Sequence, residues 1–407
     1  MSVQDQGRVA RRVVFYIPGF DPFPPRRYRE LYRKEGAAQA ALSGYRLTLA
    51  PSDKGAAFGW QVKAEIEGET VETRFEVLVW DDLVRASMPD SIAATYAQML
   101  RTIAVYVGSG AVWPLVRLRQ GPVIAGFYPV VMLILQALVA ALAVWAVAAL
   151  AATVLPVWAA LLPGLGAGWL VLRGWKRIDG RLFAHYLMHD LAYCAQGRGA
   201  YPASLETRIA GFVARLRAAL GEGVDEVLVV GHSSGATLGV SVLADLLRAG
   251  LPPGGPHLSF LSLGHSVPMA SFLPEAGRLR ADLAWMAAQD RVPWVDVSAP
   301  GDGCCYALCD PVAVTGVAPP GARWPLVLSA AFSQTLSPER QAALRRRYFR
   351  LHFQYLCAFD ALPDRPDAYD YIRITAGPRT LWSRMGRRAP SPGRITRPVS
   401  RYRDMAP

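Results

Sequence analysis

Residues 225–250, DEVLVVGHSSGATLGVSVLADLLRAG, determine how the rest of the chain is interpreted. The stretch opens with a strand-like segment at 225–230, whose apolar run at 227–230 is typical of a strand in the middle of a parallel sheet. A helical pattern occupies 236–248 and ends at Gly250. The pentapeptide GHSSG at 231–235 lies between them, so this sequence predicts a strand that turns directly into a helix around a serine.

Ser233 is the central residue of this Gly-x-Ser-x-Gly pattern. The pattern alone occurs by chance in many chains, but a strand before it and a helix after it make it specific. Small residues at both glycine positions let the strand and the helix approach each other while the serine stays at the tip of the turn. We therefore predict that Ser233 is a nucleophile, with a purely structural turn as the alternative.

The same alternation of strand and helix recurs along the chain, which predicts an α/β fold with a doubly wound, mostly parallel sheet. Strand-like runs lie at 12–17, 45–50, 60–67, 73–80, 257–264 and 293–298, and helical patterns lie at 26–42, 89–106, 178–196, 204–220 and 276–290.

An apolar segment interrupts this pattern. Between Arg119 and Arg173, 53 residues include no Asp, Glu, Lys or Arg. The segment is too long for one membrane span of about 20 residues, so we expect two spans, at 127–150 and 153–172, joined by a turn near residues 151–152. A pair of buried helices in a soluble core is the alternative, but neither helix shows the polar stripe that such helices carry.

The charges that flank the hairpin predict its orientation. Basic residues stand before it and after it, at Arg117, Arg119, Arg173, Lys176, Arg177 and Arg181. The positive-inside rule then places both termini and the catalytic domain in the cytoplasm. Residues 1–12 are polar and basic with no apolar stretch behind them, which does not resemble a cleavable signal.

Four segments follow from this reading of the chain. Residues 1–119 and 173–375 are the two parts of one α/β domain that carries Ser233, 120–172 are a transmembrane helical hairpin, and 376–407 are a basic tail. The tail carries seven of the chain's twelve net positive charges. We expect it to be flexible and to contact anionic lipid through its positive charge. Nucleic acid is not expected as a partner, because no aromatic pattern or motif indicates it.

With these residues in place, the chain resembles the lipase-like members of the α/β-hydrolase superfamily, in which the nucleophile is followed by an acid and then by a base. His352 is the one histidine after residue 265, so this order makes it the base, and Tyr355 three residues later matches a pattern common in these relatives. Asp302, just past the strand at 293–298, is the preferred acid, with Asp310 and Asp296 as alternatives.

The resemblance also implies an oxyanion hole, built from two backbone N–H groups. One donor is expected from Ser234, the residue after the nucleophile. The other is expected from the loop after the strand at 12–17, from either Gly19 or Phe20.

These features predict a membrane-anchored serine hydrolase that cleaves an acyl ester or thioester, with an acyl lipid as the expected substrate. The alternative is a catalytically inactive membrane scaffold of the same fold. No cofactor or metal is expected. Cys304, Cys305 and Cys309 lack a CxxC pair and a nearby histidine, and the i, i+4 pair His185 and His189 lacks a third ligand.

Overall fold

The computed structural model describes residues 7–52, 57–362 and 368–406. Eight strands in these residues form one sheet in the order β2-β3-β4-β1-β5-β6-β7-β8. Only the β2–β3 and β3–β4 pairs are antiparallel, which confirms the α/β class with a mostly parallel sheet. The strands are β1 (Arg11–Ile17), β2 (Arg46–Pro51), β3 (Gly59–Ile66), β4 (Glu69–Val77), β5 (Glu226–His232), β6 (His257–Leu263), β7 (Trp294–Ser298) and β8 (Leu326–Ser329).

Helices connect the strands. α1 (Arg26–Ser43) follows β1, and the connection from β4 to β5 contains α2 (Asp81–Ala86), α3 (Ile92–Gly108), α4 (Val112–Leu118), α5 (Gln120–Ala151), α6 (Val157–Arg177), α7 (Asp179–Leu182), α8 (Ala184–Ala195), the 3-10 turn η1 (Gln196–Gly199) and α9 (Ala203–Ala219). After β5 come α10 (Ser234–Arg248), α11 (Val267–Ser271), α12 (Gly277–Ala288), α13 (Pro311–Thr315), α14 (Phe332–Thr335), α15 (Pro338–Leu344), α16 (Tyr348–His352), η2 (Phe353–Leu356), α17 (Tyr371–Ala376) and α18 (Leu381–Met385).

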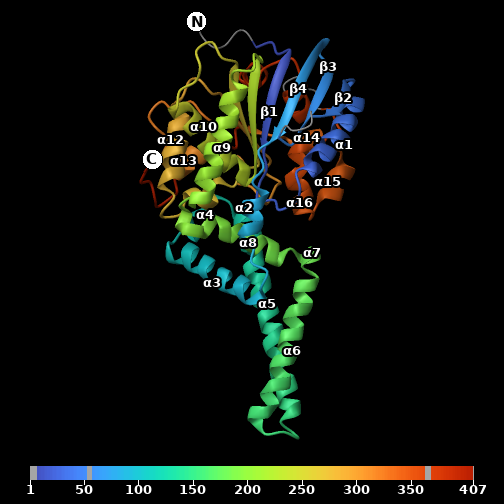
Figure 1. The fold of residues 1–407 in the computed structure, drawn as a ribbon, viewed down its shortest axis with the longest axis vertical. Helices are drawn as coiled ribbons and strands as arrows, with labels where there is room; N and C mark the ends of the chain where they lie inside the picture. The colour runs from blue at the N-terminus through green and yellow to red at the C-terminus, as the bar shows by residue number, and fades with distance from the viewer. Residues whose placement is uncertain (1–6, 53–56, 363–367, 407) are drawn as a thin grey trace.

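Helices cover both faces of the sheet (Figure 1). Along β1, Val13 and Phe15 face a core shared with α9, α10 and α12. Val14 and Tyr16 face the opposite core, shared with α1, α17 and α18. Successive strand residues point to opposite faces, so a buried run such as β1 requires both layers.

Strands from both sides of the apolar segment contribute to this single sheet. β1 pairs with β4 on one edge and with β5 on the other, with Val14 opposite Leu228. The segments 1–119 and 173–375 therefore share one core, and the hairpin is an insertion between β4 and β5.

α5 and α6 form an antiparallel pair that projects from the sheet domain (Figure 1). Both are long enough and apolar enough to cross a membrane. α5 extends beyond its predicted span of 127–150 at both ends, while α6 begins and ends later than its predicted span of 153–172. The turn between them covers residues 152–156 rather than 151–152. The first part of α5 belongs to the domain, because Val130 and Leu133 are buried in a core with α3 and α8.

The helix predicted at 178–196 is broken. α7 ends at Phe183, whose φ of 57° is left-handed, and α8 starts again in a new direction. Asp179 caps this second start, since its carboxylate accepts hydrogen bonds from the backbone N–H groups of His185 and Tyr186.

The basic tail packs against the domain, which corrects the expectation of a flexible end. Leu381 and Met385 are fully buried, and Arg384 forms an ion pair with Glu67 at 2.9 Å. Further along, the backbone N–H of Ile395 donates to the Leu308 carbonyl at 2.8 Å. Arginine content alone predicted flexibility, but acidic partners and apolar residues within the same segment order it through residue 406.

Candidate active site

The backbone at Ser233 is strained. Its φ of 58° and ψ of −125° belong to a region that residues other than glycine rarely occupy. The turn is tight because a Cβ at Gly231 would lie 2.7 Å from Ala236 Cα, and one at Gly235 would lie 2.2 Å from the Ile17 carbonyl oxygen. Both glycines are therefore sterically required, and Ser233 lies half-buried at the tip of the turn between β5 and α10.

His352, at the end of α16, is held by a carboxylate. Its Nδ1 lies 2.7 Å from Asp302 Oδ2, and because a carboxylate only accepts, Nδ1 carries the proton. The Tyr355 hydroxyl donates to the same carboxylate oxygen at 3.0 Å, and the Cys304 N–H donates to the other at 2.9 Å. Burial alone would raise the pKa of Asp302, but the charge of His352 and these hydrogen bonds hold it below its usual value.

The imidazole of His352 adjoins the turn that carries the serine. The His232 ring lies 4.7 Å from the His352 ring between centroids, and a Cβ on Gly264 would lie 3.2 Å from His352 Cε1. The residue before Gly264, Leu263, accepts the Ser233 N–H at 2.9 Å. Nε2 of His352 is buried and has no hydrogen-bond partner among the described residues, so the Ser233 hydroxyl does not bond to it in this structure.

His232 also supports the backbone of His352. Its Nε2 lies 3.0 Å from the His352 backbone carbonyl oxygen, which makes Nε2 the donor. Burial, together with the neighbouring charge of His352, lowers the pKa of His232 to about 3, so its ring stays neutral. It therefore positions His352 without adding charge. The sequence analysis did not assign this role, although His232 stands next to Ser233.

Asp310 and Asp296, the alternative acids, have other partners. Asp310 caps α13 by accepting hydrogen bonds from the N–H groups of Val312 and Ala313, and burial raises its pKa to about 6. Asp296 lies inside β7, where it accepts a hydrogen bond from the Ser262 hydroxyl at 2.6 Å. The structure brings Asp302, and neither alternative, to His352.

The loop after β1 lies against the same turn. A Cβ on Gly19 would lie 3.1 Å from Ser233 Cβ, a contact tighter than most, so this loop packs closely against the turn. The Phe20 N–H donates to Ser234 Oγ at 2.8 Å, while the Trp80 indole and the Tyr186 hydroxyl donate to the carbonyls of Pro18 and Phe20. Gly19, Phe20 and Ser234, the residues predicted to supply backbone donors, thus lie at the Ser233 turn. The Phe20 amide is already occupied by the Ser234 hydroxyl.

A narrow pocket of about 50 Å³ opens beside Ser234. On the scale where one water needs about 10–15 Å³, it has room for a few heavy atoms. Its walls are mostly aromatic and aliphatic, from Phe20, Trp80, Tyr193, Tyr201, Leu205 and Leu238.

One carboxyl group, Asp190 of α8, also lines this pocket. Burial raises the pKa of Asp190 to about 7, although the charge of His352 acts in the opposite direction. The sequence analysis missed Asp190, because it lies in a plain helical segment and only the fold brings it to the site.

One cluster among the described residues has side chains that could bind a metal ion. Asp302, Cys304 and His352 place potential ligand atoms within 4.8 Å of one another. Both oxygens of Asp302 already accept hydrogen bonds, and burial raises the pKa of the Cys304 thiol, which keeps it protonated and a poor ligand. The second candidate pair packs between helices, with His189 Nδ1 2.6 Å from Gln98 Oε1 of α3.

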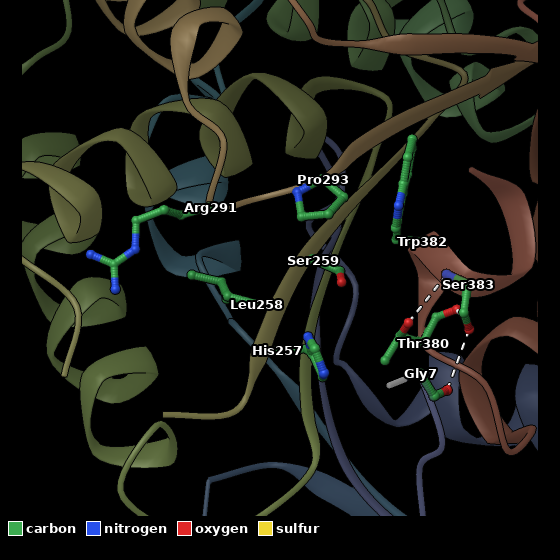
Figure 2. Close-up of a pocket in the computed structure, with 9 residues that line it drawn as sticks. All are labelled: Gly7, His257, Leu258, Ser259, Arg291, Pro293, Thr380, Trp382 and Ser383. Atoms are coloured by element: carbon green, nitrogen blue, oxygen red, sulfur yellow. Dashed lines mark hydrogen bonds between the residues drawn. The ribbon is translucent and has the colours of Figure 1, made fainter. Parts of the chain in front are cut away.

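Another pocket, of about 20 Å³, lies at the opposite end of the strands from Ser233, where β6 and β7 begin (Figure 2). Thr380 and Ser383 of the carboxyl-terminal segment line it, and their polar groups hydrogen-bond to each other and to Gly7. It is far along the strands from Ser233, which follows the carboxyl end of β5.

Comparisons with protein-family models, curated proteins and solved structures found no match. What the structure shows is an α/β protein with a mostly parallel eight-stranded sheet and two apolar helices long enough to span a membrane.

Proposed function

We propose that the chain is a membrane-anchored serine hydrolase of the α/β-hydrolase type that cleaves an acyl ester or thioester. The observation that carries this proposal is the strained Ser233 turn beside the 2.7 Å His352–Asp302 hydrogen bond. Serine nucleophiles need a neighbouring base and a third group that orients that base, and these residues provide both.

In this mechanism, His352 Nε2 takes the proton from the Ser233 hydroxyl as the serine oxygen attacks the carbonyl carbon. Asp302 keeps the Nδ1–H tautomer in place and stabilises the imidazolium. The oxyanion forms near the amides of Ser234 and the Gly19–Phe20 loop. His352 then protonates the leaving alcohol or thiol. Water attacks the acyl-enzyme with His352 again as the base, which releases the acid and restores the Ser233 hydroxyl.

The position of the site favours an amphipathic substrate. The carboxyl ends of the parallel strands face the side from which α5 and α6 project, and α8, which lines the pocket, packs against α5 (Figure 1). A substrate held in a bilayer would therefore be close to Ser233, and the pocket beside Ser234 would take the part of the acyl group next to the carbonyl. The basic residues on both flanks support a cytoplasmic domain and termini.

The test is labelling of the full-length protein by a fluorophosphonate probe, followed by a panel of lipid esters and thioesters. Labelling should occur and should be lost in Ser233→Ala. Ser234→Ala should still be labelled, because Ser234 contributes its backbone amide. If Ser234→Ala loses labelling and Ser233→Ala keeps it, the nucleophile is misassigned.

The acid can be tested in the same way. Asp302→Asn should lower kcat by a factor on the order of 10⁴, by analogy with the serine-protease triad. Asp310→Asn should change stability little, because asparagine caps a helix about as well as aspartate, and it should leave kcat nearly unchanged. The reverse pattern would exclude Asp302 as the acid.

The second candidate function is a catalytically inactive membrane scaffold of this fold. It would fold normally, show no probe labelling and hydrolyse none of the lipid esters. The Asp302–His352 hydrogen bond and the strained Ser233 turn favour the enzyme over this alternative.

A further inference from the structure

The exposed face of α3 is apolar. Its outward residues recur at helical spacing and form one stripe, which we call the α3 stripe: Ala93, Ala97, Leu100, Ala104 and Val107. Leu100 is 63% exposed and Val107 is 59% exposed. The structure describes the whole of α3, and within it Arg101 is the only exposed polar residue. A helix that faces water normally carries polar residues along its exposed face, so a different surrounding is expected here.

The opposite face of α3 packs on the domain. Met99 and Tyr106 are buried in a core with Met188 and Leu191 of α8. α8 lies between α3 and the sheet, so the α3 stripe points toward the side from which α5 and α6 project (Figure 1). α3 therefore has two apolar faces, and the domain covers one of them.

The register of α5 and α6 shows where the base of the hairpin lies along α5. A Cβ on Gly168 of α6 would meet Ala140 and Val144 of α5. Arg177 is nine residues further along α6, so in this antiparallel pair it is level with α5 near Leu133. Arg177 is exposed and follows the charge-free segment of the hairpin. Basic residues in this position mark the boundary between the apolar core of a bilayer and water.

α3 crosses α5 at this same level. The Tyr96 hydroxyl donates to the Leu133 carbonyl at 2.9 Å, and the ring of Tyr106 lies 5.7 Å from that of Phe127 between centroids. The ten residues from Tyr96 to Tyr106 rise by about 15 Å, whereas the six from Phe127 to Leu133 rise by about 9 Å, so α3 runs obliquely across α5 and not along it. Membrane helices tilt by up to about 40°, and a tilt of the hairpin within this range can bring such a helix flat against the bilayer surface.

We propose that the α3 stripe lies in the membrane–water interface of the bilayer that α5 and α6 cross, with Leu100 among the first acyl carbons and Arg101 at the head groups. This inference rests on the membrane anchoring in the proposed function. A helix with one apolar face toward the bilayer and a basic residue beside that face is the type that lies in the interface plane.

Two observations favour this position over a third span. The face of α3 opposite the stripe is occupied by α8, and the chain bends by 75° between α3 and α4. Because α8 also lines the pocket beside Ser234, the contact of α3 with lipid would hold that pocket at a fixed height above the bilayer.

The experiment is site-directed spin labelling of the full-length protein in vesicles of phosphatidylethanolamine and phosphatidylglycerol. The accessibility of a nitroxide to oxygen and to a water-soluble nickel complex gives its depth. At Leu100→Cys the nitroxide should lie about 5–10 Å into the boundary between head groups and acyl chains. The unsubstituted protein gives the background from the five native cysteines.

Two exposed positions are the matched controls. Leu165→Cys, near the middle of α6, should lie deeper in the bilayer than Leu100→Cys. Ala210→Cys, on α9 of the sheet domain, should be in water. Should Leu100→Cys not fold, Val107→Cys on the same stripe gives the comparison, at a shallower depth because of the oblique path of α3.

The outcomes are distinct. A label at Leu100 that is as accessible to the nickel complex as one at Ala210 would place the stripe in water and overturn the inference. A label as deep as that at Leu165 would make α3 part of a further span and would also overturn it. Protection from both reagents, with spectral broadening that disappears on dilution with unlabelled protein, would assign the stripe to a second copy of the chain.

The same measurement separates this inference from the proposal on which it rests. A label at Leu165 in contact with water would overturn the membrane anchoring itself, and the interfacial position of α3 with it. A label at Leu165 in the bilayer and one at Leu100 in water would overturn the position of α3 alone. Probe labelling of Ser233 tests the hydrolase activity independently of both.

Discussion

Ser233 occupies a backbone conformation that a serine adopts only at a cost, on the order of 1–3 kcal/mol for such sites. Glycine accepts the same dihedral angles freely. Ser233→Gly should therefore raise the free energy of unfolding by about 1 kcal/mol while it abolishes probe labelling. Denaturant unfolding in detergent measures the first effect.

The control for this stability change is Ser234→Gly. Position 234 begins α10 in a helical conformation, so glycine there should destabilise the helix, by about 1 kcal/mol. If both glycine variants change stability in the same direction, strain at Ser233 is not the cause.

Asp190 should make stability depend on pH. An acid whose folded pKa is about 7, above its unfolded value of about 4, is protonated more readily in the folded state. Its contribution is favourable below pH 4 and is lost as the pH rises to about 7. The melting temperature of the wild type should therefore fall relative to that of Asp190→Asn across this window.

The groups that act on Asp190 make this test specific. The charge of His352 lowers the pKa of Asp190, and Tyr186 and Cys194, whose own pKa values are raised by burial and by Asp190, stay neutral in the window. Parallel melting curves for the two proteins from pH 4 to pH 7 would show that Asp190 does not titrate as expected.

Among the elements, the hairpin is held by small residues on one face of α6. Ala160, Gly164 and Gly168 are buried against α5, and a Cβ on Gly164 would lie 2.7 Å from the Val144 carbonyl oxygen. Close approach of this kind is how helices associate in lipid.

Gly164→Leu should push the two helices apart and destabilise the protein by about 1–3 kcal/mol. Gly166→Leu is its matched control, because a side chain there would meet nothing within 4 Å, and it should leave the melting temperature in detergent unchanged or slightly higher. Equal effects of the two substitutions would mean that the α5–α6 contact does not stabilise the hairpin.

The elements that the sequence predicted well are those with unambiguous periodicity. β5 and α10 agree with prediction to within two residues, and the two apolar helices were found because a charge-free segment of this length has few alternatives. β8 was missed, because its four residues, LVLS, are too few to show the alternation or the apolar run that identifies a strand. The break at Phe183 was missed because the capping by Asp179 depends on the path of the chain after it.

The candidate site was predictable where it depends on local sequence and chain order, as for Ser233 and His352. The choice between Asp302 and Asp310 was open, because both follow a strand in loops and only the position of α16 shows which carboxylate meets His352. Asp190 could not be inferred, since its place in the pocket depends on how α8 returns from the hairpin.

For the whole molecule, the carboxyl-terminal segment is part of the core. The buried Arg12 side chain donates to the carbonyls of Gly377 and Arg379, and the buried Glu226 accepts the Leu381 N–H. Removal of residues 377–407 would take these hydrogen bonds from Arg12 and Glu226, which would keep their mutual ion pair and the Ser259 hydroxyl. It would also expose the apolar surface that Leu381 covers.

We therefore expect this truncation to remove at least about 3–6 kcal/mol, which is much of the stability of a typical domain, and to abolish cooperative melting. Arg394→Gln/Arg397→Gln, which changes two exposed arginines of the same segment, should shift stability by no more than about 0.5 kcal/mol. An unchanged melting temperature after truncation would mean that the segment is not needed for folding.

The insertion of the hairpin between β4 and β5 also sets a timetable for synthesis. β1 ends at Ile17, and its partner β5 begins at Glu226, so at about 5–20 residues per second the ribosome needs roughly 10–40 s to supply the missing neighbour. During that interval one edge of β1 has unpaired backbone groups that could pair with another chain. The apolar helices emerge within the same interval, so a chain that inserts them into a bilayer can do so before its sheet can close. Newly made chains that fail to insert would thus carry both an open strand edge and a bare hairpin, and they would be the first to aggregate.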